Sequence, residues 1–269
     1  MRKNSILVKS TIISIFILLL FFTNVSYAKE KVKTNEDILK EYIDKGFKGG
    51  NIEQRNTLLR FQAENNLTVD GVLGEDVKKA LDEKNKENID KIPEEIKSRT
   101  WFIVINKSKK ILTVYRKGEV YKKYPVALGR ASTPTPDYQC KIINKFKNPY
   151  WGGMGKYTPI PGGAPNNPLG KRWLGLSTEK HSGYGIHGNI SPYSIGGYVS
   201  NGCIRMINED VEELYKYLPL KTQVWIGDEE LLKKWGIEQY IEYNDEKNEE
   251  NISIDNNIII RGIRMIMIE

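Results

Sequence analysis

Apolar residues recur with two different periods along the chain, and the change of period divides it. Between residues 34 and 81 they recur at helical spacing in three short runs, which predicts a small three-helix N-terminal domain. From Trp101 onward, short apolar runs alternate with polar turns, which predicts a β-meander. Helical spacing returns convincingly at residues 208–218, shortly after Cys203. The pattern therefore predicts an α+β protein: three helices, then a mostly β domain with one main helix.

Polar and charged segments set the expected boundaries. Residues 82–100 are almost all charged or polar and predict a linker. Residues 228–269 predict a C-terminal tail that is partly disordered, because the tract from Asn244 to Asn251 contains no apolar residue. We therefore expect the helical domain at residues 29–81 and the β domain at residues 101–227.

The first 28 residues have the pattern of a targeting segment. Basic residues precede an apolar run at residues 11–22, and Ser26 and Ala28 place small side chains at the −3 and −1 positions of a cut before Lys29. This arrangement predicts a secretory signal peptide at residues 1–28. An uncleaved membrane anchor is the alternative, although the run is shorter than the ~20 residues that span a bilayer core.

Composition agrees with an exported globular protein. The chain is 39% hydrophobic, which is enough apolar material for a core, and its formal net charge is +7. Outside the membrane, a mildly basic balance favours weak attraction to anionic polymers such as a wall surface. We expect no nucleic-acid partner, because the sequence has no nucleic-acid motif or dense basic stripe.

Two cysteines and two histidines occur in 269 residues, and one of each lies in a glycine-rich stretch. His187 precedes Cys203 by sixteen positions, so they are a candidate base and nucleophile. The alternatives are a disulfide between Cys140 and Cys203, or a buried packing thiol beside a structural histidine. The four residues match no metal motif, so we expect no metal and no cofactor. His181 has no assigned role.

The glycines around this pair predict how the site works. The Gly188 carbonyl is positioned to accept a ring N–H of His187 and fix its tautomer. The backbone N–H groups of Gly202 and Cys203 are the expected donors to an oxyanion. Arg205 supplies a charge for a substrate carboxylate or for the thiolate.

Two segments rich in proline and glycine predict long loops. They cover residues 133–136 and residues 152–170. Long loops on a rigid scaffold often carry binding residues, but a purely structural Ω-loop explains the composition equally well.

The helical part resembles the second half of a peptidoglycan-binding domain of the small three-helix type. The resemblance is carried by residues 59–74, with Phe61-Gln62 followed by Asp70-Gly71 and Gly74. Glu75 stands where that family usually has threonine. The resemblance implies that residues 34–81 bind glycan strands; a plain helical spacer is the alternative.

Residues 101–226 resemble the L,D-transpeptidase (YkuD-type) catalytic domain. The matching phrases are Tyr124-Pro125-Val126-Ala127-Leu128-Gly129, Thr133-Pro134-Thr135-Pro136, Asn166-Asn167-Pro168-Leu169-Gly170, Ile186-His187-Gly188 and Ser200-Asn201-Gly202-Cys203-Ile204-Arg205-Met206.

This resemblance implies a cysteine-dependent enzyme that cross-links peptidoglycan stem peptides through an acyl-enzyme. Cys203 then corresponds to the nucleophile, His187 to the base and Gly188 to the carbonyl that orients the imidazole. Gly202, Arg205, Asn201 and Ser200 correspond to oxyanion or substrate-binding positions. Asn201 stands where many members have a second histidine, and Cys140 falls on a strand position that suggests packing.

Several functions are compatible with these residues. Donor and acceptor stem peptides are the expected partners, and an L,D-carboxypeptidase uses water in place of the acceptor amine. A cysteine wall hydrolase or a non-catalytic wall-binding protein is a further alternative. The expected location is the cell wall or the extracytoplasmic face of a bacterial cell, with membrane contact only through an uncleaved signal segment.

Overall fold

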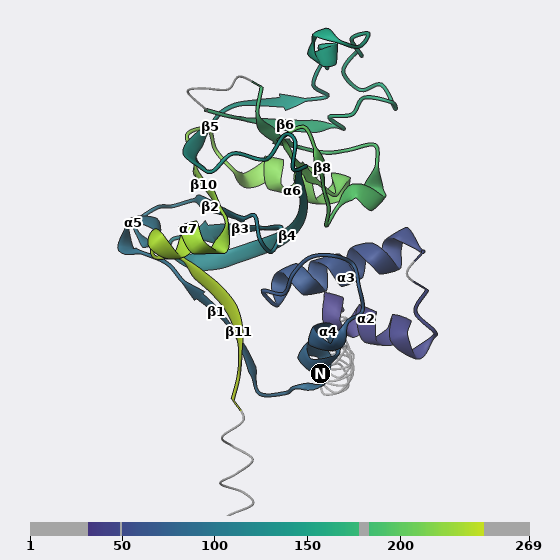
Figure 1. Cartoon of the computed structure of the whole chain (residues 1–269), viewed down its shortest axis with the longest axis vertical. Helices are drawn as coiled ribbons and strands as arrows, with labels where there is room; N and C mark the ends of the chain where they lie inside the picture. The colour runs from purple at the N-terminus through teal and green to yellow at the C-terminus, as the bar shows by residue number, and fades with distance from the viewer. Residues whose placement is uncertain (1–31, 49, 178–182, 245–269) are drawn as a thin grey trace, which may run out of the picture. The chain divides into compact units, whose positions relative to one another are not determined.

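A nine-stranded sheet dominates the part of the chain that the computed structural model describes, residues 32–48, 50–177 and 183–244 (Figure 1). Its strands are β2 (Phe102–Asn106), β3 (Ile111–Arg116), β4 (Glu119–Gly129), β5 (Tyr138–Lys147), β6 (Arg172–Leu176), β7 (Gly185–His187), β8 (Tyr198–Ser200), β9 (Ile204–Met206) and β10 (Gln223–Gly227). Their spatial order is β3-β2-β10-β5-β6-β7-β9-β4-β8. Because β3 also pairs with β4, the sheet closes on itself, and β8 lies outside the closed ring.

The predicted meander is confirmed, since β2, β3 and β4 pair antiparallel in sequence order. β4 continues past the meander: Val126 and Ala127 pair with β9, and Leu128 and Gly129 pair with β8. One long strand therefore connects the meander to the segment that carries the cysteine.

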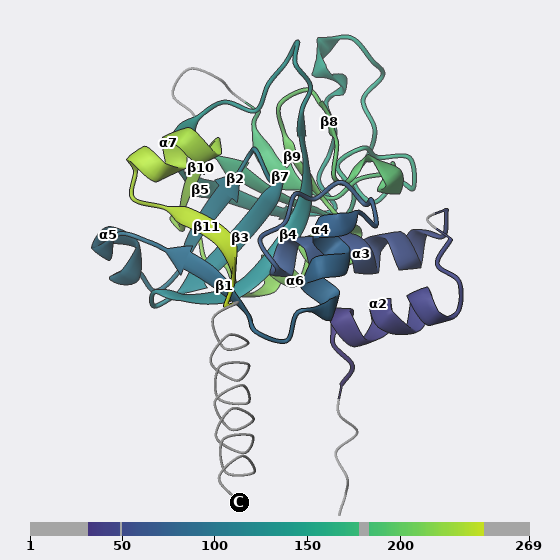
Figure 2. The ribbon, with the colours of Figure 1, turned by 60° about the horizontal axis from the view of Figure 1, so that its bottom comes forward.

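The main core lies between this sheet and helix α6 (Asn208–Tyr217), which begins where the apolar pattern predicts a helix. Val211 and Leu214 on α6 are fully buried. Burying side chains of this kind stabilises a fold by about 1.5–3 kcal/mol each. Figure 2 shows α6 packed beside the sheet, and it contacts β6 and β7 in particular.

Three helices occupy the predicted N-terminal positions: α2 (Asn35–Asp44), α3 (Ile52–Glu64) and α4 (Glu75–Asp82). The side chain of Asn51 caps α3 by accepting the backbone N–H groups of Glu53 and Gln54. Gln62 on α3 holds the following turn, because its Oε1 accepts the N–H groups of Asp70 and Gly71 at 3.1 and 2.9 Å.

The sequence predicts a separate helical domain, but these helices share a core with the sheet. Leu59, Ala63 and Val69 are buried in one cluster with Ile111 and Ala127 from the strands. The described residues from Asn35 to residue 244 form one compact unit, and α3 contacts β4 directly (Figure 2).

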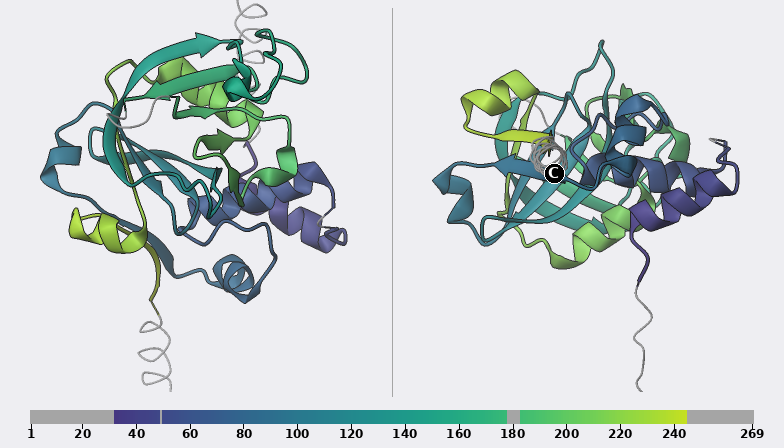
Figure 3. Two further views of the ribbon diagram at one scale, coloured as in Figure 1. Left: turned by 45° about the horizontal axis from the view of Figure 1, so that its top comes forward. Right: turned by 90° about the horizontal axis from the view of Figure 1, so that it is seen from below.

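The predicted linker at residues 82–100 is also wrong. It contains strand β1 (Lys86–Lys91) and the short helix α5 (Glu94–Lys97). β1 pairs antiparallel with β11 (Glu238–Tyr243), which follows α7 (Glu229–Lys234) (Figure 3). The part of the predicted tail that precedes residue 244 therefore belongs to the fold, whereas the predicted signal segment, His181 and residues 245–269 lie outside the described residues.

A buried polar network fixes β1 and explains why its apolar content is low. The Asp90 carboxylate accepts hydrogen bonds from Tyr115 Oη at 2.7 Å and from Gln239 Nε2 at 3.0 Å, and it pairs with the Lys123 ammonium at 2.5 Å. Lys123 is only 5% exposed. A hydrophobic pattern cannot report a strand whose buried contacts are charges and amides.

None of the helices in the three described ranges has the length and apolar content needed to cross a membrane.

We predict that Asp90→Ala destabilises the protein strongly. The substitution leaves the Lys123 ammonium buried without its carboxylate, and losing one partner of a buried pair costs about 3–5 kcal/mol. Urea unfolding followed by tryptophan fluorescence measures the loss. The control is Glu94→Ala, which removes the exposed ion pair with Lys97 and leaves the midpoint nearly unchanged. Equal midpoints for both variants would contradict the role of the network.

Candidate active site

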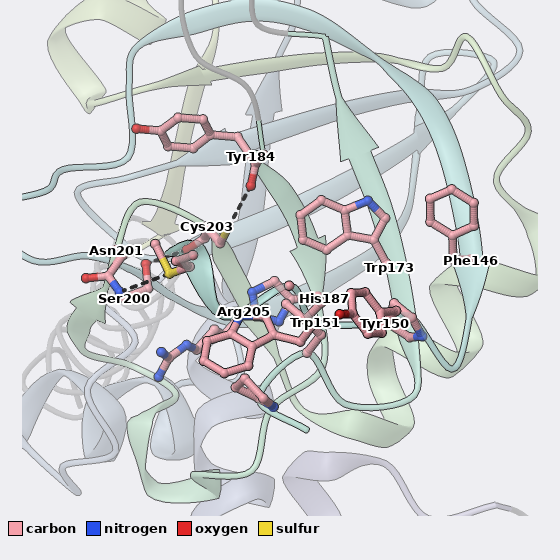
Figure 4. Close-up of a pocket in the computed structure, with 16 residues that line it drawn as sticks. Phe146, Tyr150, Trp151, Trp173, Tyr184, His187, Ser200, Asn201, Cys203 and Arg205 are labelled. Carbon is pink, nitrogen blue, oxygen red and sulfur yellow. Dashed lines mark hydrogen bonds between the residues drawn. The ribbon is translucent and has the colours of Figure 1, made fainter. Parts of the chain in front are cut away.

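A cleft of about 860 Å³ opens beside strands β5, β6, β7 and β9. Cys203, His187, Arg205, Ser200 and Asn201 line it together (Figure 4). Much of the remaining wall is aromatic or apolar and comprises Phe146, Pro149, Tyr150, Trp151, Met154, Pro168, Leu169, Trp173 and Tyr184. The structure thus brings five of the predicted site residues into one cavity. Gly188 and Gly202 are not among the lining residues, and each contacts one that is.

The pairing of strands β7 and β9 brings together site residues that are far apart in the sequence. His187 ends β7, and Arg205 lies in β9; the two strands are parallel neighbours, with His187 opposite Arg205. Cys203 directly precedes β9, so the register of the strand pair places it opposite Gly185, at the start of β7, and on the same face of the sheet as Arg205. The spacing of sixteen residues between base and thiol is the length of the connection between these strands.

The imidazole of His187 is held in one orientation. Its Nδ1 is 2.6 Å from the Gly188 carbonyl oxygen, which can only accept, so Nδ1 carries the proton. Nε2 is therefore left as the acceptor, and the Gly188 carbonyl holds the ring in this orientation. The indole of Trp173 stacks on the ring with centroids 5.7 Å apart. Its own N–H donates to Asn144 Oδ1 at 2.9 Å, which fixes the indole in turn.

Burial sets the protonation state of the pair. It lowers the pKa of His187 to about 4, an effect that the nearby Arg205 charge reinforces and the Gly188 hydrogen bond opposes. Burial also raises the pKa of the Cys203 thiol, against the opposing influence of the Gly185 backbone N–H and of Arg205. Both shifts favour a neutral thiol and a neutral imidazole in the free protein. Proton transfer must then accompany attack on a substrate.

The turn before Cys203 is fixed by the Ser200 hydroxyl. Its Oγ accepts the Gly202 N–H at 3.0 Å and donates to the Cys203 carbonyl at 2.6 Å. The Gly202 N–H is thus engaged inside the turn, and its role as an oxyanion donor stays a prediction. Glycine is needed there for another reason: φ is +108°, and a Cβ would lie 2.4 Å from the Tyr184 ring.

The two proline and glycine loops have different roles. Thr135 Oγ1 donates to the Gly202 carbonyl at 2.9 Å, and Thr133 Oγ1 donates to the Ser200 carbonyl at 3.2 Å, so residues 133–136 support the cysteine turn from behind. Residues 152–170 contribute Met154 and Leu169 to the cleft wall instead. The structural alternative is therefore correct for the first loop, and the second is part of the binding surface.

Asn201 links two segments at the rim of the cleft. Its Oδ1 accepts a hydrogen bond from the Arg130 guanidinium, and its Nδ2 lies 3.8 Å from Met154 Sδ. The residue that departs from the common family pattern thus bridges the end of β4 and the loop after β5. His187 remains the histidine of the described cleft.

Cys140 is a packing residue. It lies in β5 opposite Val224, is 7% exposed, and belongs to the main core. Both cysteines are free, so the alternative of a disulfide is wrong, and burial raises the pKa of the Cys140 thiol to about 12. Within the three described ranges, no group of three or more His, Cys, Asp or Glu side chains is arranged to hold a metal ion.

Sequence reasoning missed the aromatic wall and Arg130. Trp173 and Tyr184 reach the site because β6 and β7 pair and because the turn at Gly202 has no side chain. Their positions in the sequence, in or beside short apolar runs, are equally typical of core residues. No signal in the sequence separates them from the core.

Comparison with known proteins agrees with this geometry. The family model of the L,D-transpeptidase catalytic domain, YkuD, matches residues 100–226. The chain is 38% identical over 130 residues to the putative L,D-transpeptidase YqjB of Bacillus subtilis, covering 48% of this chain and 72% of that protein. It is 40% identical over 127 residues to the putative L,D-transpeptidase YkuD of Bacillus subtilis, covering 47% of this chain and 66% of that protein.

Solved structures include an L,D-transpeptidase from Mycobacterium tuberculosis H37Rv, with a TM-score of 0.41, 18% identity, and coverage of 48% of this chain and 58% of that one. A buried base of fixed tautomer and a thiol that line the same cleft are typical of a cysteine-nucleophile enzyme. The chain belongs to the YkuD family of L,D-transpeptidases. Residues 34–81 lie outside the matched region, so their resemblance to a peptidoglycan-binding domain stays a prediction.

We predict that acylation of Cys203 keeps its rate at acidic pH. A base with a lowered pKa stays neutral to lower pH, so the acid limb of kcat/KM should fall near pH 4, not near the ordinary value for histidine of about 6.5. Rapid-quench mass spectrometry of the acyl-enzyme between pH 3.5 and 8 measures the limb. His187→Gln should lower the rate and abolish the limb. A midpoint near pH 6.5 would show that the imidazole is not desolvated.

Proposed function

We propose that the protein joins two peptidoglycan stem peptides by acyl transfer through Cys203. The observation that carries the proposal is the hydrogen bond from His187 Nδ1 to the Gly188 carbonyl, because it leaves Nε2 as a proton acceptor in the cleft that contains the thiol. The donor is a tetrapeptide stem, and the acceptor is a side-chain amine of a second stem.

In the first step, His187 Nε2 takes the Cys203 proton as the sulfur attacks the peptide carbonyl that follows an L-centre. The C–N bond to the terminal D-amino acid breaks, and the protonated imidazole gives its proton to the departing amine. We assign the oxyanion to the backbone N–H of Cys203, because the Gly202 N–H is already engaged.

In the second step, the acceptor amine loses a proton to His187 and attacks the thioester. A new amide forms, the C–S bond breaks, and the proton returns to the Cys203 sulfur. Water in place of the amine would release a tripeptide, which is the L,D-carboxypeptidase reaction. The two routes share every residue up to the thioester, so their balance depends on access of the acceptor to the cleft.

Arg205 is the proposed contact for a donor carboxylate. It lies beside His187 in the strand pair and lines the cleft, and its Nε is buried without a hydrogen-bond partner. A buried guanidinium donor without a partner is costly, and a carboxylate relieves that cost through two parallel hydrogen bonds.

Export to the bacterial wall is part of the same proposal. Its support is the pattern of residues 1–28 and the identity of the substrate, since stem peptides occur outside the cytoplasmic membrane. Fractionation of cells that produce the full chain, with N-terminal sequencing of the mature protein, tests both the location and the expected cut before Lys29.

We also propose that the helical part contacts glycan strands, through a second cavity of about 510 Å³. The cavity is lined by Tyr42, Asn56 and Arg60 from the helices and by Asn189 and Asn208 from the β part. A polar cavity with an aromatic ring suits a hydroxyl-rich ligand. Asn56 Oδ1 supports this, because it is buried without a partner and needs a donor such as a sugar hydroxyl.

We predict that Cys203→Ala abolishes cross-linking of disaccharide-tetrapeptide. Mass spectrometry should show dimers and tripeptide with the wild type and neither product with the variant. Cys140→Ala is the matched control, because it removes the other thiol from the core without touching the cleft, and it should retain activity. Equal dimer formation by Cys203→Ala would overturn the mechanism. A wild type that yields tripeptide alone would assign it as a carboxypeptidase.

We predict that Tyr42→Ala weakens binding to purified sacculi by about tenfold, since one stacked aromatic ring contributes ~1–1.5 kcal/mol. Co-sedimentation of the full chain in a Cys203→Ala background measures it, because the helices share a core with the sheet and are not expected to fold alone. Val72→Ala, at an exposed apolar residue outside the cavity, is the control. Equal retention of both variants would exclude this cavity as the glycan site.

A further inference from the structure

Helix α3 is joined to α6 by a buried ion pair. Arg60 Nη2 lies 2.7 Å from Asp210 Oδ1, and Arg60 Nε lies 3.1 Å from the same oxygen. Asp210 is 4% exposed and lies in the first turn of α6, the helix that follows the strand of Arg205. Two donors on one buried carboxylate define both the distance and the angle between the helices.

The first residue of α6 clamps the segment after His187. Asn208 Oδ1 accepts the Asn189 N–H at 2.9 Å, and Asn208 Nδ2 donates to the Asn189 carbonyl at 3.0 Å. The fit is tight, because a Cβ on Gly188 would lie 2.4 Å from Asn208 Oδ1. Glycine is therefore required at position 188, and a shift of α6 would be transmitted through the two hydrogen bonds to the backbone of Asn189, next to Gly188.

The position of Gly188 in turn determines the orientation of the His187 ring, because the Gly188 carbonyl accepts a hydrogen bond from His187 Nδ1 at 2.6 Å. We propose that Arg60 is a positioning residue for His187, acting through Asp210 and Asn208. The helical part of the chain is then a component of the catalytic machinery and not only a candidate wall-binding module.

Two further contacts hold the connection between base and nucleophile against the same helix. Arg55 Nη2 on α3 donates to the Ile195 carbonyl at 2.9 Å, and Tyr193 Oη donates to the Gly50 carbonyl at 2.9 Å. Gly196 is so close to α3 that a Cβ would lie 3.1 Å from Leu59. The whole segment from His187 to Cys203 is thus fixed at several points by α3 and the residue before its cap.

This inference rests in part on the proposed function, so its test uses two independent measurements on the full chain. The first is the ¹⁵N signature of the His187 ring, which reports the Nδ1–H tautomer without any substrate, and the small number of histidines simplifies assignment. The second is the rate of Cys203 acylation by disaccharide-tetrapeptide. The variants are Arg60→Ala, Arg60→Lys, Asn208→Ala and the double variant Arg60→Ala/Asn208→Ala.

We expect Arg60→Ala and Asn208→Ala to give mixed tautomers and to lower kcat about tenfold with KM little changed, because misplacing a base affects the transition state and not ground-state binding. The double variant should lose no more than the more damaging single variant, since both act on the same path. Arg60→Lys should recover part of the rate. Glu36→Gln is the matched control: it removes a carboxylate from a helix-to-strand ion pair, with Lys86, that does not lead to His187.

The proposal is overturned if Arg60→Ala and Asn208→Ala both keep the wild-type tautomer and rate, or if their losses add in the double variant. If Arg60→Ala fails to fold by circular dichroism, Arg60→Lys and Asn208→Ala decide by the same criteria. If the wild type itself shows no acylation, the proposed function fails, while the ring signature still decides the positioning role.

Discussion

The parallel pairing of β7 with β9 is the constraint on which the site depends. It places His187 opposite Arg205 and leaves Cys203 just before the second strand. Parallel neighbours require a crossover connection, and here that connection is an irregular segment held by α3, by β4 and by Asn208. Because this segment carries little regular structure of its own, its shape depends on what packs against it.

Desolvation explains why the catalytic pair is built from neutral groups. The same burial lowers the pKa of His187 and raises that of Cys203, so a preformed thiolate–imidazolium pair is disfavoured. A neutral thiol is protected from chance alkylation and oxidation in an exposed cleft, since the thiolate is the reactive form. The cost is that the substrate must help to trigger proton transfer. The buried Arg205 Nε, which has no hydrogen-bond partner, marks where the negative charge of a substrate would be bound.

The fold was predictable where burial follows a period, and it was not where polar contacts replace apolar ones. The three N-terminal helices, the meander and α6 follow from apolar spacing. Strands β1 and β11 could not be predicted from apolar spacing, because their contacts with the fold include the polar side chains of Asp90 and Gln239, which hydrogen-bond to each other. Nor does the sequence tell whether Leu59 packs within a helical domain or against the sheet, since either solution buries the same side chain.

The sequence by itself determined the chemistry: a rare thiol and a rare imidazole, the Gly188 carbonyl beside the ring, and a charge two residues after the cysteine. These are properties of residue type and of immediate neighbours, which are written in the chain. Only the tertiary structure decided that the Gly202 N–H donates to Ser200 Oγ and that Trp173 and Tyr184 line the cleft. It also decided the ion pair of Arg60 with Asp210, on which the proposed coupling to the base rests. Those relations join residues far apart in sequence, and long-range pairing fixes them by geometry that no local pattern records.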